Sequence, residues 1–348
     1  MPAYYSAQEI AELQFPDIQR QASGRSDAVG LLARTCLRIR DTQADAFKGS
    51  HIDAAALSWA SACATSRAYR VRGRPGERGG HLAALLPVVD LINHAFEANC
   101  ILVDAAHLAG PGAVAVTAAR DIRAGESLRT NYGDIPNDQL LLNYGFVLEE
   151  NDHDRLSLPA GALSFALQQT VAQRLPPQLS DQEAHELTNL QTVLLQQSHL
   201  LDVTTLHITH TGEVEETTMA LVRVLVLQSP AEAAAVTNPL HVQETIIEER
   251  ARLVLFALCT SAEEELGTSI EHDLQLLATA TVSHTTAAVA TEGADGGGRD
   301  EGEGAKGEGE GEDEGGAAAA TGAGREAAIR YRLVHKKILR QAAQMYAA

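Results

Sequence analysis

Residues 87–94 read Pro-Val-Val-Asp-Leu-Ile-Asn-His, and this stretch decides how the chain is interpreted. It is an apolar run that ends in side chains able to form hydrogen bonds, Asp90, Asn93 and His94. Such a run is typical of a buried strand or a short helix. Because a buried polar group without a partner is costly, the polar end of the run must meet other polar groups or a ligand.

Two later steps place a glycine directly after a tyrosine, at Tyr132-Gly133 and at Tyr144-Gly145. An apolar run with helical spacing separates them. Glycine lets the backbone approach a ligand closely, and the phenol supplies a hydroxyl group. Read alone, the pattern also fits an ordinary core strand followed by two turns.

Together these pieces resemble the SET-domain protein methyltransferases. The resemblance is to the branch typified by the Rubisco large-subunit lysine methyltransferase, which also contains the actin-histidine methyltransferase. In that branch an Asp-Leu-Ile-Asn-His segment precedes a strand like residues 118–126, then a Tyr-Gly step, then a helix that ends in Tyr-Gly-Phe. The same pieces occur here in the same order. The resemblance implies an α+β fold: a β-rich SET domain with a helical insert, followed by an all-helical substrate-binding domain.

The expected domain boundaries follow changes in composition along the chain. Beyond residue 155, segments with helical spacing replace short strands with irregular connections. A later Thr/Ala and Gly/Glu/Asp segment has too little apolar surface to order itself, and we interpret it as a spacer. We expect a helical insert of the SET region at 1–70, the C-terminal part of the SET core at 71–155, the helical substrate-binding domain at 156–284, a disordered acidic insertion at 285–324 and the closing helix at 325–348.

Local signals predict several elements within this plan. Ser6 followed by Glu9 forms a capping box, so a short helix is expected to start there. Asp53 can cap a helix that runs through residue 68. Residues 207–209 are expected to form a short strand.

Composition excludes several classes of function. Four cysteines are widely spaced with no Cys-x-x-Cys, which argues against a zinc site or a disulfide framework and indicates a reducing compartment. The formal net charge of −19 disfavours general nucleic-acid binding through phosphates. No apolar run approaches the roughly 18 residues that a membrane-spanning helix needs. We therefore expect no metal, no nucleic acid and no membrane among its partners.

The resemblance implies S-adenosylmethionine as cofactor and Tyr132 as the catalytic tyrosine. Residues 66–69, Ser-Arg-Ala-Tyr, resemble a Ser-Arg-Ala-Phe element of the family, whose arginine lies beside the cofactor. On spacing alone, the better interpretation of Arg67 is a solvated cation at a helix end, because the helix dipole favours a cation there, and it is the resemblance that favours the cofactor contact. The residues implied to bind the cofactor are Arg67, Asp90, Leu91, Ile92, Asn93, His94, Tyr144, Gly145 and Phe146.

Methyl transfer to an amine constrains the chemistry of such a site. The attacking nitrogen must be neutral, although a free lysine has a pKa near 10.4, so the site must desolvate the amine and let a proton leave. It must also aim the lone pair at the methyl carbon. A tyrosine hydroxyl near the sulfonium can do the aiming, and a nearby cation can favour its phenolate.

These observations favour a protein-lysine N-methyltransferase, with a protein-histidine N-methyltransferase as the alternative enzyme. A third hypothesis is a non-catalytic SET-like interaction module, because the G-x-G strand pair that begins the family is not found before Arg67. We expect a protein substrate and a monomer. The N-terminus shows no signal or transit pattern, and we expect the chloroplast stroma or the cytoplasm as compartment.

Overall fold

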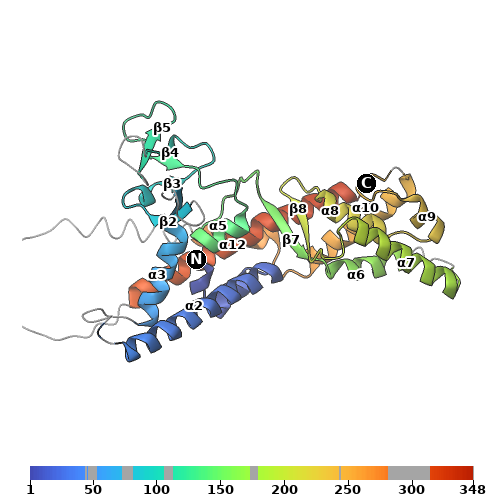
Figure 1. The fold of residues 1–348 in the computed structure, drawn as a ribbon, viewed down its shortest axis with the longest axis horizontal. Helices are drawn as coiled ribbons and strands as arrows, with labels where there is room; N and C mark the ends of the chain where they lie inside the picture. Colours follow the sequence, from blue (N-terminus) through green and yellow to red (C-terminus); the bar gives the residue numbers. More distant parts are fainter. Residues whose placement is uncertain are drawn as a thin grey trace, which may run out of the picture. The chain divides into compact units, whose positions relative to one another are not determined.

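The computed structural model describes residues 1–43, 45, 53–72, 81–105, 113–172, 179–242, 244–280 and 314–347, and it is shown in Figure 1. The chain forms two compact units. The first unit comprises Met1–Tyr4 and Gln21–Phe146, and the second comprises Tyr5–Arg20 and Val147–Ala348.

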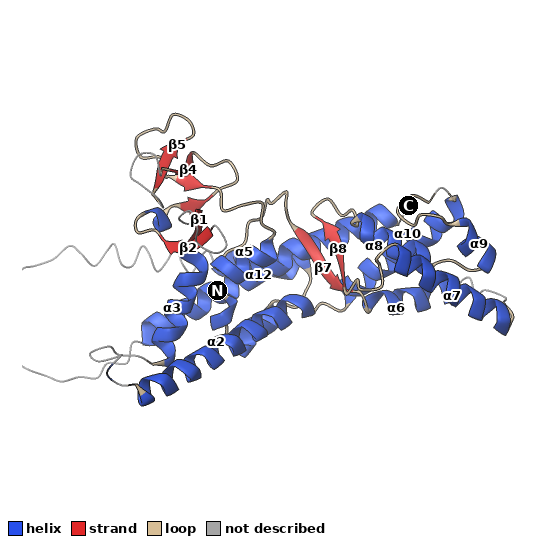
Figure 2. Cartoon of the chain, in the orientation of Figure 1, coloured by secondary structure: helices blue, strands red, loops and turns tan. Residues whose placement is uncertain are grey.

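The first unit combines helices with three two-stranded sheets, whose strands are red in Figure 2. Strands β1 and β2 pair antiparallel, β4 and β5 pair antiparallel, and the very short β3 and β6 pair parallel. Its elements are η1 (Pro2–Tyr4), α2 (Pro16–Thr42, whose first residues belong to the second unit), α3 (Ala54–Arg67), β1 (Ala68–Arg72), β2 (His81–Leu85), η3 (Val89–Leu91), β3 (Asn93–His94), β4 (Cys100–Asp104), β5 (Val114–Ala118), β6 (Arg129–Thr130) and α5 (Asn137–Tyr144).

Two helix ends in this unit position the residues discussed below. Asp53 caps α3, because its Oδ1 accepts a hydrogen bond of 2.7 Å from the amide of Ala56. The helix ends at Arg67, one residue before the predicted end. Helix α5 ends at Tyr144 and is capped by Gly145, which adopts the left-handed conformation (φ 84°) that favours glycine. The chain can therefore turn sharply after Tyr144.

The second unit is mainly helical. Its elements are α1 (Ala7–Glu12), β7 (Arg155–Pro159), α6 (Ala162–Leu167), a π-helical turn η4 (Gln168–Ala172), α7 (Asp181–Gln197), β8 (Thr205–Thr209), α8 (Glu216–Leu225), α9 (Pro230–Ala235), α10 (Thr245–Glu264), a helix over residues 270–280 and α12 (Glu314–Tyr346). Capping boxes begin α1 at Ser6 and α7 at Ser180. Helices α10 and α12 pack along each other, and α12 also contacts β7 and β8 (Figure 1).

The fold class is confirmed: small sheets accompany the first part of the chain, and a helical region follows. The second unit is not all-helical, however, because β7 and β8 form an antiparallel pair with Ser157 opposite His207. The predicted strand at 207–209 is part of β8, whereas β7 was not predicted. In both strands buried apolar residues alternate with partly exposed ones, so one face of the pair is covered.

The compact units differ from the expected domains at two boundaries. The first unit ends at Phe146, before the predicted boundary at residue 155. Residues 5–20, expected within the SET region, belong to the second unit. The reason is packing, because Phe15 lies edge-on against Tyr331 of α12, with ring centroids 6.3 Å apart. Long-range burial of this kind has no local sequence signal.

The closing helix α12 begins at Glu314, earlier than the predicted start at residue 325. Ala318, Ala319 and Ala320 lie in this added stretch, and alanine has the highest intrinsic helix propensity. Of the predicted insertion at 285–324, residues 285–313 lie outside the described residues. Among the described residues, no helix is both long and apolar enough to cross a membrane.

A buried charge network joins three segments of the second unit. Asp273 is fully buried and accepts hydrogen bonds from Arg332 (Nε 3.0 Å and Nη2 2.8 Å) and from Lys336 (Nζ 2.6 Å). Arg332 also donates to the carbonyl oxygen of Glu12 at 2.8 Å and pairs with the Glu12 carboxylate. Burial raises the pKa of Asp273, but hydrogen bonds from Arg332, Lys336 and Thr268 outweigh it and lower the pKa below its ordinary value. The network thus holds α1, the segment at 268–273 and α12 together.

Candidate active site

An open pocket of about 180 Å³ in the first unit collects most of the residues that the sequence analysis singled out. It is formed by the end of α3, by η3 and β3, by the segment after β6 and by the end of α5. Of the predicted site residues, it brings together Arg67, Asp90, Leu91, Asn93, Tyr132, Tyr144 and Phe146. Ser66 also lines the pocket and was not predicted.

The other predicted residues, Ile92, His94 and Gly145, do not line the pocket but support it. The Ile92 carbonyl oxygen accepts a hydrogen bond of 2.8 Å from the Tyr132 hydroxyl. His94 Nδ1 accepts a hydrogen bond of 3.1 Å from the Tyr132 backbone amide. Gly145 provides the turn that separates Tyr144 from the segment beyond α5. Tyr132 is therefore held at both its backbone and its hydroxyl end.

The electrostatic environment keeps the Tyr132 phenol protonated at neutral pH. Burial raises its pKa above the ordinary value near 10, and the neighbouring Tyr144 raises it further. Arg67 and Arg129 lower the pKa, but their effect is smaller. Desolvation of the charged phenolate thus outweighs the attraction of these two cations.

Aromatic rings make up one side of the pocket. The ring centroids of Tyr132 and Tyr144 lie 4.9 Å apart with planes at 34°, and those of Tyr144 and Phe146 lie 6.1 Å apart at 45°. Such tilted rings expose aromatic faces and edges that suit another planar ring or an alkyl-ammonium group.

Arg67 places a cation at the pocket rim. Its Nη1 donates to the carbonyl oxygen of Asp90 at 2.9 Å and lies 3.5 Å from the Asp90 carboxylate. In the part of the chain that the structure describes, both contacts use Nη1, whereas a guanidinium carries five N–H donors. The remaining donors of this partly exposed side chain are available to an anionic group of a ligand.

The chemistry of these residues fits part of S-adenosylmethionine. A guanidinium suits the carboxylate of its methionine end, the Asn93 amide can hydrogen bond, and the rings of Tyr144 and Phe146 suit an adenine. The pocket volume of about 180 Å³ is smaller than the roughly 300 to 1,000 Å³ of typical small-molecule sites. The pocket volume is therefore enough for only part of such a ligand. No cluster of three or more His, Cys, Asp or Glu with metal-binding geometry occurs among the described residues.

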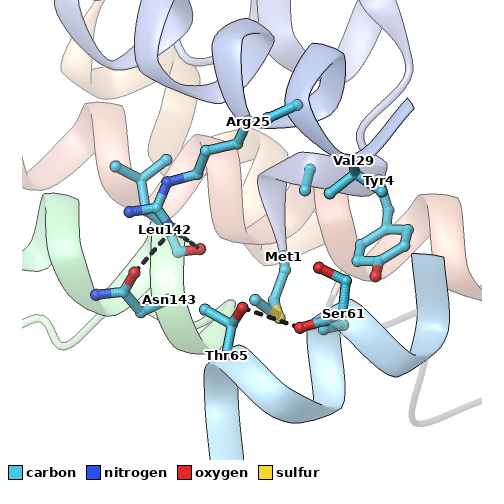
Figure 3. A pocket seen from close by; sticks show the side chains of 11 residues that line it. Met1, Tyr4, Arg25, Val29, Ser61, Thr65, Leu142 and Asn143 are labelled. Carbon is cyan, nitrogen blue, oxygen red and sulfur yellow. Dashed lines mark hydrogen bonds between the residues drawn. The ribbon is translucent and has the colours of Figure 1, made fainter. Parts of the chain in front are cut away.

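A larger pocket of about 350 Å³ lies between η1, α2, α3 and α5 in the same unit (Figure 3). Its lining is mostly apolar, and its main polar feature is Arg25. The Nη1 atom of Arg25 donates to the Leu142 carbonyl oxygen at 2.9 Å and to Asn143 Oδ1 at 2.7 Å. Because this pocket gathers few reactive groups, we place the chemistry in the smaller one. Arg25 instead braces the last turn of α5, which carries Tyr144.

Replacing Arg25 by methionine is expected to destabilise the first unit by about 1.5 to 3 kcal/mol, because two hydrogen bonds to a charged donor are lost at a partly buried position. Chemical denaturation followed by circular dichroism measures this change. Arg38→Met, on the exposed side of the same helix, is the matched control and should change stability by less than about 0.5 kcal/mol. Equal effects of the two substitutions would contradict the bracing role.

Tyr69 was missed by the sequence analysis, although it contributes to the architecture around η3. Its hydroxyl donates to the carbonyl oxygen of Val89 at 3.1 Å, and burial raises its pKa. The contact joins β1 to η3, the segment that carries Asp90 and Leu91. The residue ends the Ser-Arg-Ala-aromatic motif, but its contact with Val89 has no local signal, because the contact depends on how η3 folds back on β1.

Comparison with known proteins agrees with this architecture. Residues 12–133 match the SET domain, and residues 182–339 match the family described as "Rubisco LSMT substrate-binding". The actin-histidine N-methyltransferase of Canis lupus familiaris is 27% identical over 229 residues, covering 64% of this chain and 37% of that protein. The chain thus spans little more than a third of this curated relative.

Two solved structures share the fold over 99% of this chain. The SET domain of LSMT bound to lysine and AdoHcy has a TM-score of 0.57 at 17% identity, and the match covers 67% of its chain. Rubisco LSMT bound to AdoMet has a TM-score of 0.53 at 16% identity, and the match covers 66% of its chain. At such low identity these matches concern the fold alone.

Proposed function

We propose that this chain, which combines a SET domain with a Rubisco LSMT substrate-binding domain, is an S-adenosylmethionine-dependent protein-lysine N-methyltransferase. The observation that carries the proposal is the convergence of Arg67, Asn93 and Tyr144 on the pocket around the doubly anchored Tyr132. These residues come from elements far apart in the sequence. Their convergence supports a catalytic pocket over an ordinary core.

The proposed roles follow from the chemistry of each side chain. S-adenosylmethionine, when bound, supplies an electrophilic methyl group. Arg67 would pair with the carboxylate of the cofactor, Asn93 would hydrogen bond to it, and Tyr144 and Phe146 would hold its adenine. Tyr132, which is neutral, orients the acceptor amine by hydrogen bonding and takes no proton itself. Desolvation between the aromatic rings lowers the pKa of the incoming amine, so that its proton leaves to water before attack.

A protein-histidine N-methyltransferase is the second candidate, and one observation favours it. The curated relative that matches 64% of this chain is named an actin-histidine N-methyltransferase. An imidazole needs less help than a lysine to present a neutral nitrogen, because its ordinary pKa is near 6.5. A pocket with a protonated tyrosine serves either acceptor.

The test is a labelled-methyl assay with purified chain on actin, on the Rubisco large subunit and on a total protein extract. Acid hydrolysis of the products, followed by amino-acid analysis, separates methyllysine from methylhistidine. Label in methyllysine supports the proposal, and label in methylhistidine supports the second candidate. If neither appears and calorimetry detects no S-adenosylmethionine binding at millimolar concentration, the non-catalytic module is the better description.

Arg67→Met is expected to weaken S-adenosylmethionine binding by about 10- to 100-fold, since a charge-assisted hydrogen bond contributes about 1.5 to 3 kcal/mol. Isothermal titration calorimetry measures the change. Arg70→Met, an exposed arginine on the neighbouring strand β1, is the control and should leave the affinity within about twofold. An equal loss of affinity in both variants would mean that the net positive charge of the region matters, and not a contact between Arg67 and the cofactor carboxylate.

We further propose that the second unit binds the protein substrate, that the chain is a monomer, and that it works in the chloroplast stroma or the cytoplasm. Support for the substrate role comes from the family matched by residues 182–339. Light scattering of the purified chain tests the monomer, and imaging of a fluorescent fusion tests the compartment.

A further inference from the structure

His94 is the second residue of β3, and the residue is 9% exposed. Parallel pairing of β3 with β6 places His94 opposite Thr130, so that Tyr132 follows two residues later. The backbone amide of Tyr132 therefore faces the His94 ring and donates a hydrogen bond of 3.1 Å to Nδ1. The short sheet therefore brings the imidazole to the backbone of the proposed catalytic tyrosine.

The direction of this hydrogen bond assigns the protonation state of the ring. An amide N–H can only donate, so Nδ1 must carry a lone pair and the proton must sit on Nε2. Nε2 is buried and has no hydrogen-bond partner within the described residues. In the imidazolium form both nitrogens donate, and Nδ1–H would face the amide proton of Tyr132. The contact therefore exists only with the neutral ring.

We propose that His94 is a positioning residue for methyl transfer, a role that rests on the proposed function. Its neutral imidazole anchors the backbone of Tyr132, while the carbonyl oxygen of Ile92 anchors the hydroxyl at 2.8 Å. Ile92 and His94 lie in one short segment, and together they fix both the backbone and the hydroxyl of Tyr132 relative to the pocket. Protonation of His94 releases the backbone anchor and lets the hydroxyl move from its working position.

Packing holds the ring in the orientation that this contact needs. Its centroid lies 4.8 Å from that of Phe96 with planes at 85°, 5.2 Å from Tyr132 at 40° and 6.1 Å from Phe146 at 31°. Tyr132 is the titratable side chain among these ring contacts, and its own pKa is raised, so it stays neutral. The nearest cation along β6 is Arg129, which acts on Tyr132. The three rings in contact with His94 are thus uncharged.

The pH dependence follows from these neighbours. Burial lowers the pKa of His94, and the backbone of Thr130 raises it by less, so the folded value lies below the ordinary 6.5. At neutral pH the ring is unprotonated and the anchor is intact. As pH falls through the lowered pKa, the folded state must take up a proton and lose the anchor. Both activity and the stability of this unit are expected to fall on the acid side.

Two substitutions separate anchoring from packing. His94→Asn keeps an acceptor oxygen near the position of Nδ1 but does not titrate. His94→Phe keeps an aromatic ring but has no acceptor. We expect His94→Phe to lower kcat by about 10- to 100-fold at every pH, with KM for S-adenosylmethionine changed less than threefold. We expect His94→Asn to retain kcat within a few fold and to lose the acid limb of the pH profile.

Nuclear magnetic resonance of the unmodified chain provides a readout that needs no activity. The ¹⁵N shifts of His94 should show the Nε2–H tautomer at pH 7.5, and the Tyr132 amide should exchange slowly. A proton on Nδ1, or an unchanged Tyr132 amide in a folded His94→Phe variant, would overturn the positioning role. If the tautomer is Nε2–H but no methyl transfer occurs on any substrate, the anchor stands and the proposed enzyme fails. If His94→Phe does not fold, the spectrum of the unmodified chain and the His94→Asn profile still decide.

Discussion

Tyr132→Phe is expected to reduce methyl transfer by about 100-fold or more, while S-adenosylmethionine affinity changes by less than about threefold. The substitution removes one hydroxyl, which donates to the carbonyl oxygen of Ile92, and keeps the ring that packs 4.9 Å from Tyr144. Ground-state binding should therefore survive. An interaction that orients the acceptor amine acts mainly in the transition state, and its loss appears in kcat.

Tyr69→Phe is the matched control for this prediction. Tyr69 also has a raised pKa and donates through its hydroxyl to a backbone carbonyl oxygen, that of Val89, yet it does not line the pocket. We expect its kcat to remain within about threefold of the parent value. Single-turnover assays with labelled cofactor, together with calorimetry, measure both variants. Parental transfer by the Tyr132→Phe protein would remove Tyr132 from the catalytic role.

Asp273→Ala is expected to destabilise the second unit by about 3 to 5 kcal/mol. The substitution leaves Arg332 and Lys336 as buried cations without their shared carboxylate, and an uncompensated buried charge is among the costliest single changes. Thermal unfolding followed by calorimetry should show a large drop in the melting temperature. Lys336→Met should cost less, because the pair between Arg332 and Asp273 remains intact.

The control and the pH dependence make this second prediction specific. Glu271→Ala removes a surface ion pair in which Arg340 Nη1 lies 3.1 Å from Glu271 Oε1, and it should leave the melting temperature nearly unchanged. The pKa of Asp273 is lowered in the folded state, so its contribution is present above the unfolded value near 3.9 and is lost as pH falls through the lower folded value. The parent should therefore lose stability below about pH 4. If the stability of the parent and that of the Asp273→Ala variant fell equally as the pH was lowered, this account would be contradicted.

The sequence by itself determined the family resemblance, the fold class and most of the pocket lining. Asp90 to His94 are neighbours along the chain, so a single motif placed them together. Tyr132 and Tyr144 were marked by the glycine that follows each. Helix starts at Ser6 and Asp53 were also predictable, because a cap is formed by residues within one helical turn.

Only the tertiary structure decided which segments meet. Residues 5–20 belong to the second unit because Arg332 reaches Glu12 across more than 300 positions, and β7 exists because it pairs with β8. The protonated state of Tyr132 and the acceptor role of His94 likewise depend on burial and on which donors face them. Caps and periodicity act over a few residues and leave a pattern in the sequence. Desolvation and long-range hydrogen bonds arise between segments whose approach no local pattern specifies.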